Sequence, residues 1–186
     1  MAEVVLVRHG ETEWSKAGRH TGRTDVPLTA EGRRQAEHVG AQLAGRSFSL
    51  VLTSPLSRAY ETCRLAGFGD RAESCEDLVE WDYGSYEGAT TEEIRHSQPG
   101  WTVFAGGAPG GETAEQVGRR VDRVIARIRS SPGDVALFAH AHVLRVLAAR
   151  WLGLEPAGGR YFALATASVS VLGQERETSV IQRWNL

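Results

Sequence analysis

Three short apolar runs mark strands that are buried on both faces. They are Val4–Val7, Leu50–Leu52 and Val135–Phe138. Uninterrupted runs of this length, rich in branched residues, are typical of strands inside a parallel sheet. Two later segments, Ser168–Leu172 and Thr178–Trp184, predict two further strands.

Between these strands lie segments whose apolar residues recur at the spacing of a helix. Thr29 is a suitable N-cap for a helix in which Ala36, Val39 and Leu43 recur at helical intervals before Gly45. Further on, the pairs Thr90 with Glu93 and Thr113 with Gln116 form capping-box patterns. The helix after the second pair carries one apolar stripe, made of Val117, Val121, Val124, Ile125 and Ile128. A last helix is expected at residues 143–152.

This alternation of strands and helices predicts an α/β fold. We expect a three-layer sandwich with a mainly parallel central sheet and helices on both faces. A length of 186 residues fits a single domain spanning residues 1–186.

Composition limits the function classes. The formal net charge is −2, so the chain has no general electrostatic reason to bind nucleic acid or an anionic membrane. Its two cysteines, Cys63 and Cys75, match no metal-ligand spacing and are too few for a disulfide scaffold. No segment is apolar enough to span a bilayer, and no signal sequence begins the chain. We therefore expect a cytoplasmic protein.

Polar side chains follow each of the three buried strands. Arg8 and His9 follow the first, the segment Ser54–Arg58 follows the second, and His140 follows the third. Ser54 is a suitable N-cap and Pro55 suits the first helical position, which would put Arg58 in the first turn. Because ligands bind at the carboxyl ends of parallel strands, we expect these groups to meet at one edge of the sheet.

Two arginines and two histidines around one pocket suit a phosphate dianion. Arg8 and Arg58 can each grip an oxyanion in a two-pronged manner. His9 could attack phosphorus to give a phosphohistidine that water later cleaves, while His140 holds the equatorial oxygens. No glycine-rich phosphate loop is present, so side chains must provide the grip.

The reaction also needs an acid for the leaving oxygen. Glu80 lies in a segment with Trp81 and Tyr83, where partial burial would raise its pKa toward neutrality. Spacing alone leaves four other carboxylates as candidates, namely Glu11, Glu13, Asp82 and Glu87.

These residues together resemble the histidine phosphatase superfamily, also called the phosphoglycerate-mutase-like family. The resemblance rests on four blocks in the family's order, which are Leu6–Thr12 with its Arg-His-Gly motif, Ser54–Ala59, Leu78–Glu80 followed by Gly84 and Glu87–Gly88, and His140. It implies the phosphoglycerate-mutase-like fold, a phosphohistidine at His9 and phosphate contacts from Arg8, Arg58 and His140. It also implies a proton donor at Glu80, and no metal or organic cofactor.

The segment from Trp14 to Asp25 most resembles the branch that contains sedoheptulose bisphosphatases and small actinobacterial acid phosphatases. Ser15 stands where mutases usually carry Asn and can still donate to phosphate. Thr21 and Gly22 are expected substrate contacts. Ala141 replaces a glycine common in the family, and its methyl group is expected to restrict the backbone near the phosphate.

The remaining frame of the substrate is polar and partly basic, which suits a sugar or polyol phosphate and would also fit a second anionic group. The residues expected there are Trp14, Lys16, His20, Arg23, Trp81, Tyr83 and His142. The predicted protein is thus a phosphomonoesterase whose partner is a small phosphorylated metabolite, and the chain is compatible with a homodimer.

Three alternatives stay open. A phosphoglycerate-type mutase would use the same pocket, although the compact interval between Glu80 and His140 favours hydrolysis. His140 and His142 alternate like a metal-ligand pair, but a helix is expected to begin there. A regulatory module could keep the pocket and lose catalysis; its only support is Ala139 and Ala141, where the family commonly has Ser and Gly.

Overall fold

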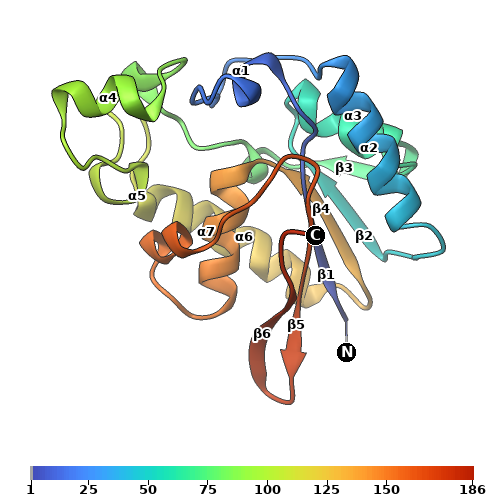
Figure 1. Ribbon diagram of the computed structural model, residues 1–186. Helices are drawn as coiled ribbons and strands as arrows, with labels where there is room; N and C mark the ends of the chain where they lie inside the picture. Colours follow the sequence, from blue (N-terminus) through green and yellow to red (C-terminus); the bar gives the residue numbers. More distant parts are fainter. Residues whose placement is uncertain (1) are drawn as a thin grey trace.

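The computed structural model describes residues 2–186 and is built on a six-stranded sheet with the strand order β3-β2-β4-β1-β5-β6 (Figure 1). The strands are β1 (Val4–Arg8), β2 (Leu50–Thr53), β3 (Ala72–Ser74), β4 (Val135–Ala139), β5 (Val169–Glu175) and β6 (Thr178–Arg183). β1 to β4 pair in parallel, whereas β5 runs antiparallel to both β1 and β6. The predicted mainly parallel sheet is confirmed.

Helices cover both faces of this sheet. On one face lie α2 (Ala30–Gln42) and α3 (Ser57–Leu65), and on the other α6 (Ala114–Ser130) and α7 (Ala141–Trp151). The shorter helices α1 (Glu13–Lys16), α4 (Thr91–Ser97) and α5 (Val103–Gly106) do not lie on the faces of the sheet (Figure 1). Short 3-10 helices occupy Gly69–Arg71, Glu76–Leu78, Gly84–Tyr86 and Pro156–Tyr161. No helix within residues 2–186 combines the length and apolar character needed to cross a membrane.

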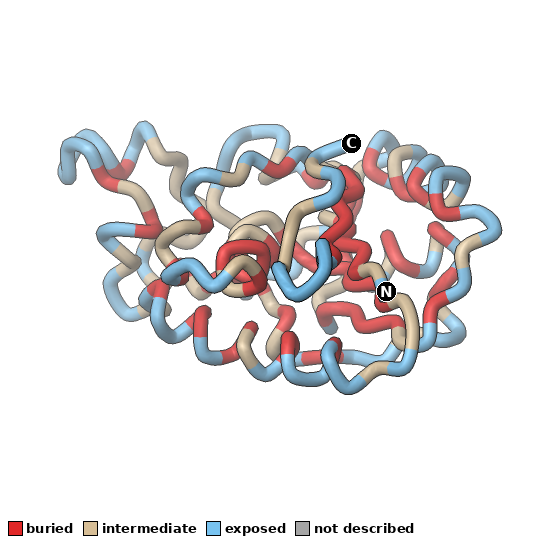
Figure 2. The backbone as a smooth tube through the Cα atoms, turned by 90° about the horizontal axis from the view of Figure 1, so that it is seen from below, coloured by how far each residue is buried: buried red, intermediate tan, exposed pale blue. Residues whose placement is uncertain are grey.

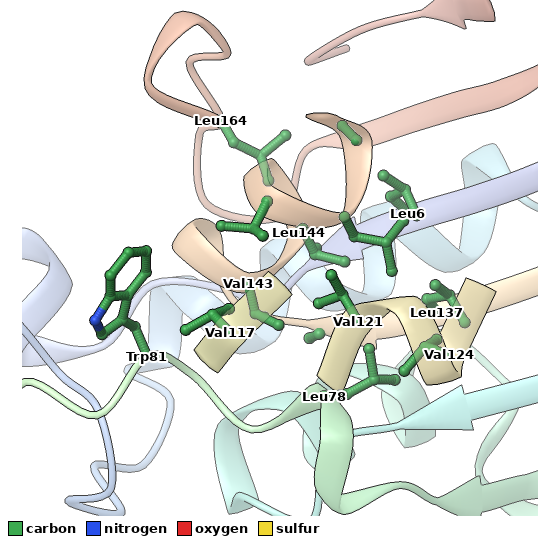
Figure 3. Packing of buried hydrophobic residues seen from close by; sticks show 14 of the residues in the cluster. Leu6, Leu78, Trp81, Val117, Val121, Val124, Leu137, Val143, Leu144 and Leu164 are labelled. Carbon is green, nitrogen blue, oxygen red and sulfur yellow. The ribbon is translucent and has the colours of Figure 1, made fainter. Parts of the chain in front are cut away.

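Side-chain alternation in the strands explains the three layers. Leu6 and the other strand side chains on the same face of the sheet pack with Val121 of α6 and Leu144 of α7, as Figure 3 shows. Val5 and Val7 point to the opposite face, where α2 and α3 cover them. Each such apolar side chain contributes about 1.5–3 kcal/mol when fully buried. Buried positions accordingly concentrate along the central strands (Figure 2), which makes the sheet a rigid base for the site.

The predicted caps at Thr29, Thr90 and Thr113 are confirmed. The side chain of Thr29 accepts a hydrogen bond from the Gly32 amide at 3.0 Å. The other two residues form complete capping boxes at α4 and α6. Local sequence chemistry therefore sets the N-termini of three of the main helices.

The predicted cap of α3 is wrong. This helix begins at Ser57, and the Asp25 carboxylate accepts from the Ser57 amide at 2.9 Å and from its hydroxyl at 2.8 Å. A distant loop thus supplies the cap of α3, while the Ser54 hydroxyl, outside the helix, accepts from the Leu56 amide at 3.3 Å and from His140 Nε2 at 2.8 Å. Arg58 still lies in the first turn, as expected. α7 begins at residue 141, two residues before its predicted start, with His140 at the N-cap position.

The register of the strands brings their polar ends together. Arg8 of β1 lies opposite Ala139 of β4, and Thr53 of β2 lies opposite Phe138. The amide of His9 then donates to the Ala139 carbonyl at 3.0 Å. In Figure 1 these strands run upward, and their carboxyl ends meet below α1.

Candidate active site

His9 and His140 lie side by side at this sheet edge. Their ring centroids are 5.2 Å apart with an interplanar angle of 61°, and both rings are buried. They follow β1 and β4, two strands that are neighbours in the sheet and more than 120 residues apart in sequence. The structure therefore brings together the two histidines that the sequence singled out.

The His9 ring is held in one tautomer. Its Nδ1 lies 2.7 Å from the Gly10 carbonyl oxygen, and because a carbonyl only accepts, Nδ1 carries the proton. Nε2 consequently keeps a free lone pair. Burial lowers the pKa of His9 well below its ordinary value, and the charges of Arg8 and Arg58 lower it further. The ring is therefore neutral at neutral pH and suited to nucleophilic attack.

Gly10 allows this geometry because the N-terminal turn of α2 presses against it. A Cβ atom at Gly10 would lie 2.3 Å from the Gly32 carbonyl oxygen, and a Cβ at Gly32 would lie 2.1 Å from the Glu11 carbonyl oxygen. Two glycines in contact thus let the His9 segment pack directly on the helix. This packing gives a physical reason for the glycine of the Arg-His-Gly motif.

His140 is also held in one tautomer, but with both nitrogens engaged. Its Nδ1 accepts from Arg58 Nε at 3.1 Å, and its Nε2 lies 2.8 Å from the Ser54 hydroxyl oxygen. Because a guanidinium only donates, Nε2 must carry the imidazole proton. Burial, followed by the charge of Arg58, lowers the pKa of His140 well below its ordinary value. His140 is therefore a neutral hydrogen-bond donor.

The two predicted arginines differ in their surroundings. Arg58 is fully buried, and its terminal nitrogens donate to the backbone carbonyls of Thr21, Gly22 and Thr24 at 2.9–3.1 Å. Arg8 borders a cavity and donates from Nη1 to the Leu164 carbonyl at 2.5 Å. Its buried Nε finds no hydrogen-bond partner among residues 2–186. Arg8 thus brings to the edge of the cavity a guanidinium that is not fully bonded within the protein and is suited to an oxyanion.

Glu80 is buried and oriented by backbone amides. Its carboxylate accepts from the amides of Trp81 at 2.9 Å, His142 at 3.0 Å and Val143 at 2.9 Å. Two of these amides belong to the first turn of α7, where the helix dipole also favours a carboxylate. The acid is thereby fixed at the same edge as the two histidines.

A cavity of about 210 Å³ opens over these groups. Its walls comprise Arg8, His9, Ser15, Gly18, Arg19, His20, Thr21, Glu80, Tyr83, Ala141, His142, Arg145 and Leu164. Glu80 is the single carboxylate in this lining. None of the four competing carboxylates borders the cavity: Asp82 pairs with Arg23, Glu87 binds the amides of Gly22 and Thr24, Glu11 accepts from the Thr29 hydroxyl, and Glu13 is exposed on α1.

Most of the expected substrate contacts border this cavity, but four side chains do not. Trp81 lies in the apolar core, as Figure 3 shows, and its Nε1 donates to the Glu112 carbonyl. The Trp14 ring packs over Gly88. Lys16 is exposed on α1, and Arg23 is exposed beside Asp82. Gly22, Arg58 and His140 are likewise absent from the lining because they lie in the layer behind it.

Two cavity arginines, Arg19 and Arg145, were missed from the sequence. Arg145 lies three residues after His142 on α7, so both side chains share one helix face. Starting the helix at residue 143 hid this relation. Arg145, His142 and His20 also border an adjoining cavity of about 200 Å³ that contains Arg95 and Arg160.

His142 and His140 do not form a metal-ligand pair. Because α7 begins between them, His142 turns away and its Nδ1 lies 2.6 Å from the Tyr83 hydroxyl, whereas His140 faces Ser54 and Arg58. Within residues 2–186, no group of three or more His, Cys, Asp or Glu side chains is arranged to hold a metal ion.

A neutral buried imidazole with a free Nε2, set among arginines beside a fixed carboxylate, is a site suited to covalent transfer of an anionic group. The family model of the histidine phosphatase superfamily (branch 1) matches residues 4–186. The chain belongs to this superfamily, as its motifs predicted.

Similar proteins agree with this assignment. An acid phosphatase of Mycobacterium tuberculosis is 44% identical over 176 residues, which cover 92% of this chain and 86% of that protein. A sedoheptulose 1,7-bisphosphatase of Saccharomyces cerevisiae is 38% identical, covering 81% of this chain and 67% of that protein. The solved structure of an open reading frame from Mycobacterium tuberculosis matches with a TM-score of 0.95 at 41% identity, covering 100% of this chain and 97% of that one. The predicted fold and the predicted class, a phosphatase, are confirmed.

Proposed function

We propose that residues 1–186 form one phosphatase domain that hydrolyses the monoester of a small phosphorylated metabolite through a phosphohistidine at His9. The observation that carries this proposal is the free Nε2 of His9 in a cavity that also contains Arg8 and Glu80. Ser15, Thr21 and Ala141 border the same cavity and are the proposed phosphate contacts.

In the first step, Nε2 of His9 attacks phosphorus and forms an N–P bond while the ester P–O bond breaks. Glu80, in its protonated form, gives its proton to the departing oxygen. The guanidinium of Arg8, which borders the cavity, binds a phosphoryl oxygen as negative charge is redistributed. Arg58, in the layer behind the cavity, adds positive potential, and His140, held there by Arg58 and Ser54, packs against the His9 ring.

In the second step, water attacks the phosphohistidine. The Glu80 carboxylate takes a proton from the water, the new O–P bond forms and the N–P bond breaks. Orthophosphate leaves, and both His9 and Glu80 return to their starting states. No step requires a metal or an organic cofactor.

The adjoining cavity supports a substrate with a second anionic group. Arg95, Arg145 and Arg160 surround it, and none of them forms an ion pair with Asp or Glu among the described residues. Uncompensated guanidiniums attract phosphate or carboxylate groups. The yeast relative is named for a sugar bisphosphate. We therefore propose a sugar or polyol phosphate that carries a second phosphate or a carboxylate.

Trapping the intermediate tests the reaction. Wild type is mixed with a 32P-labelled sugar phosphate, quenched in alkali and digested, and we expect acid-labile label on the peptide that contains His9. His9→Ala should show neither label nor phosphate release, whereas His38→Ala, at an exposed position, should behave like wild type. Turnover by His9→Ala would overturn the proposal, and a positional isomer in place of free phosphate would identify a mutase.

A substrate comparison tests the second anionic group. Arg160→Gln, at a residue that borders only the second cavity, should lower kcat/KM for a sugar bisphosphate by about 10–100-fold, the loss of one charge-assisted contact. It should change kcat/KM for an aryl monophosphate less than about threefold, since that substrate does not reach the second cavity. Equal losses on both substrates would contradict the proposal.

A cytoplasmic location and a homodimer stay predictions from the sequence.

A further inference from the structure

The loop at residues 21–24, which supplies Thr21 to the cavity, lies between two opposite charges. On one side, Glu87 Oε1 accepts from the Gly22 amide at 2.8 Å and from the Thr24 amide at 3.2 Å. Glu87 does not border the cavity and takes no part in the proposed reaction. Its carboxylate is therefore available for a different task.

On the other side, Arg58 binds the carbonyls of the same loop. Nη2 donates to the Thr21 oxygen at 3.1 Å and to the Gly22 oxygen at 2.9 Å, and Nη1 donates to the Thr24 oxygen at 2.9 Å. The remaining donor, Nε, holds Nδ1 of His140. The peptide groups of this loop thus bind the Arg58 guanidinium through their carbonyls and the Glu87 carboxylate through their amides.

Arg58 has no close carboxylate of its own. The carboxylate nearest to it is that of Asp25, at 3.9 Å and half exposed, and this side chain already caps α3. A fully buried guanidinium needs compensating negative charge close to it. Peptide dipoles that are aligned between the guanidinium and a carboxylate supply part of this compensation. Glu80 and Asp25 act on Arg58 through space more strongly than Glu87 does, but Glu87 is bonded to the same loop peptides that hold the guanidinium.

We propose that Glu87 is a positioning residue that acts on His140 through the loop and Arg58. Its carboxylate orients the peptides of residues 21–24, their carbonyls fix Arg58, and Arg58 Nε keeps His140 in the tautomer whose Nε2–H is a donor. The inference rests on the proposed function for its effect on catalysis. The link between Glu87 and the His140 tautomer can be measured without turnover.

Packing around Gly22 makes this contact sensitive to small changes. A Cβ atom there would lie 2.5 Å from the Trp81 carbonyl oxygen and 2.7 Å from Glu87 Oε2. The loop is also joined to the Glu87 segment by backbone hydrogen bonds, from Gly88 to His20 at 2.8 Å and from His20 to Ala89 at 2.9 Å. Because these bonds do not use the carboxylate, a Glu87 variant should keep the loop attached and lose only its orientation.

The test uses Glu87→Ala and the isosteric Glu87→Gln in the full chain, with Glu93→Gln as the matched control. Glu93 lies 3.8 Å from Arg19 and closes the capping box of α4, a role that glutamine also fills, and it makes no hydrogen bond to the amides of residues 21–24. We expect Glu87→Ala to lower kcat by about 10–100-fold, because its effect is on transition-state charge. KM should change less than about threefold. Glu87→Gln keeps one acceptor oxygen, so its loss should be smaller, about three- to tenfold.

The second readout is the 15N NMR spectrum of labelled histidine in the free protein. Wild type and Glu93→Gln should show His140 with an unprotonated Nδ1 and a protonated Nε2, and Glu87→Ala should show mixed tautomers or exchange broadening. Unchanged His140 signals in both Glu87 variants would overturn the inference, as would a loss confined to KM. If wild type formed no phosphohistidine, the proposed function would fail while the NMR comparison still decided the role of Glu87.

Discussion

Glu80 shows at the scale of one residue how the backbone prepares a side chain for its role. Three amides hold its carboxylate, and two of them come from the first turn of α7, next to His140. The acid is therefore aligned before a substrate arrives, and no rearrangement is needed to bring it toward the leaving oxygen.

Replacing this acid should separate substrates by their leaving groups. Glu80→Gln keeps the shape and an acceptor oxygen but cannot supply a proton. We expect kcat on an alkyl phosphate to fall by about 10²–10⁴-fold. The loss on an aryl phosphate should be far smaller, because a phenolate leaves without protonation. Parallel steady-state assays on the two substrates check this, and equal losses would remove Glu80 from the role of acid.

Gly22 gives a second residue-scale prediction. Gly22→Ala would place a methyl group against the Trp81 carbonyl and the Glu87 carboxylate, at contacts too short to accommodate it. We expect the free energy of unfolding to fall by about 1–3 kcal/mol, as for overpacking. Urea denaturation measures this. Gly133→Ala is the control, because its φ is not positive and a Cβ atom there would meet only Ser49, at 3.4 Å.

The residues that sequence reasoning identified and those it missed differ for a physical reason. Arg8, His9 and His140 directly follow apolar strands, so topology alone puts them at one edge. The surroundings of Ser54 and Arg145 depend on how side chains turn within the first helical turns. That orientation follows from the exact start of α3 and α7, and the starts of helices are the least predictable feature of a sequence.

At the scale of an element, α3 shows what local patterns leave out. The segment Ser54-Pro55 looks like a helix start, yet the helix begins at Ser57 and is capped by Asp25 from a loop more than 30 residues earlier. Neither β3 nor α5, with three and four residues, is long enough to show a period. The longer elements were predicted because burial on one face imposes a regular spacing.

The two candidate caps of α3 can be separated by mutation. Asp25→Ala should lower the free energy of unfolding by about 1 kcal/mol, the usual cost of a lost N-cap. Ser54→Ala should cost less stability and should instead lower kcat, because its hydroxyl accepts from His140. Thermal denaturation and phosphatase assays on both variants check this. A larger destabilisation by Ser54→Ala would restore the local cap that the sequence suggested.

At the scale of the whole molecule, the site concentrates buried imidazoles in an arginine-rich region. His9, His140 and His142 each have a pKa well below the ordinary histidine value, and burial is the largest cause in every case. All three are therefore neutral in the folded protein at neutral pH. In the unfolded chain, histidine titrates near pH 6.5. The unfolded state thus binds more protons than the folded state below that pH.

This difference makes stability depend on pH in a defined direction. Stability from the three neutral imidazoles is complete above about pH 6.5 and is lost as pH falls toward their folded pKa values. Each can contribute a slope of up to about 1.4 kcal/mol per pH unit. The free energy of unfolding, measured with urea, should therefore decline steeply as the pH falls from 7.5 to 5.5. His142→Gln should reduce this pH slope by the contribution of one proton, whereas His38→Gln, at an exposed position, should not. A flat profile would mean that protonated imidazoles are accommodated in the folded protein, contrary to their position among Arg8, Arg58 and Arg145.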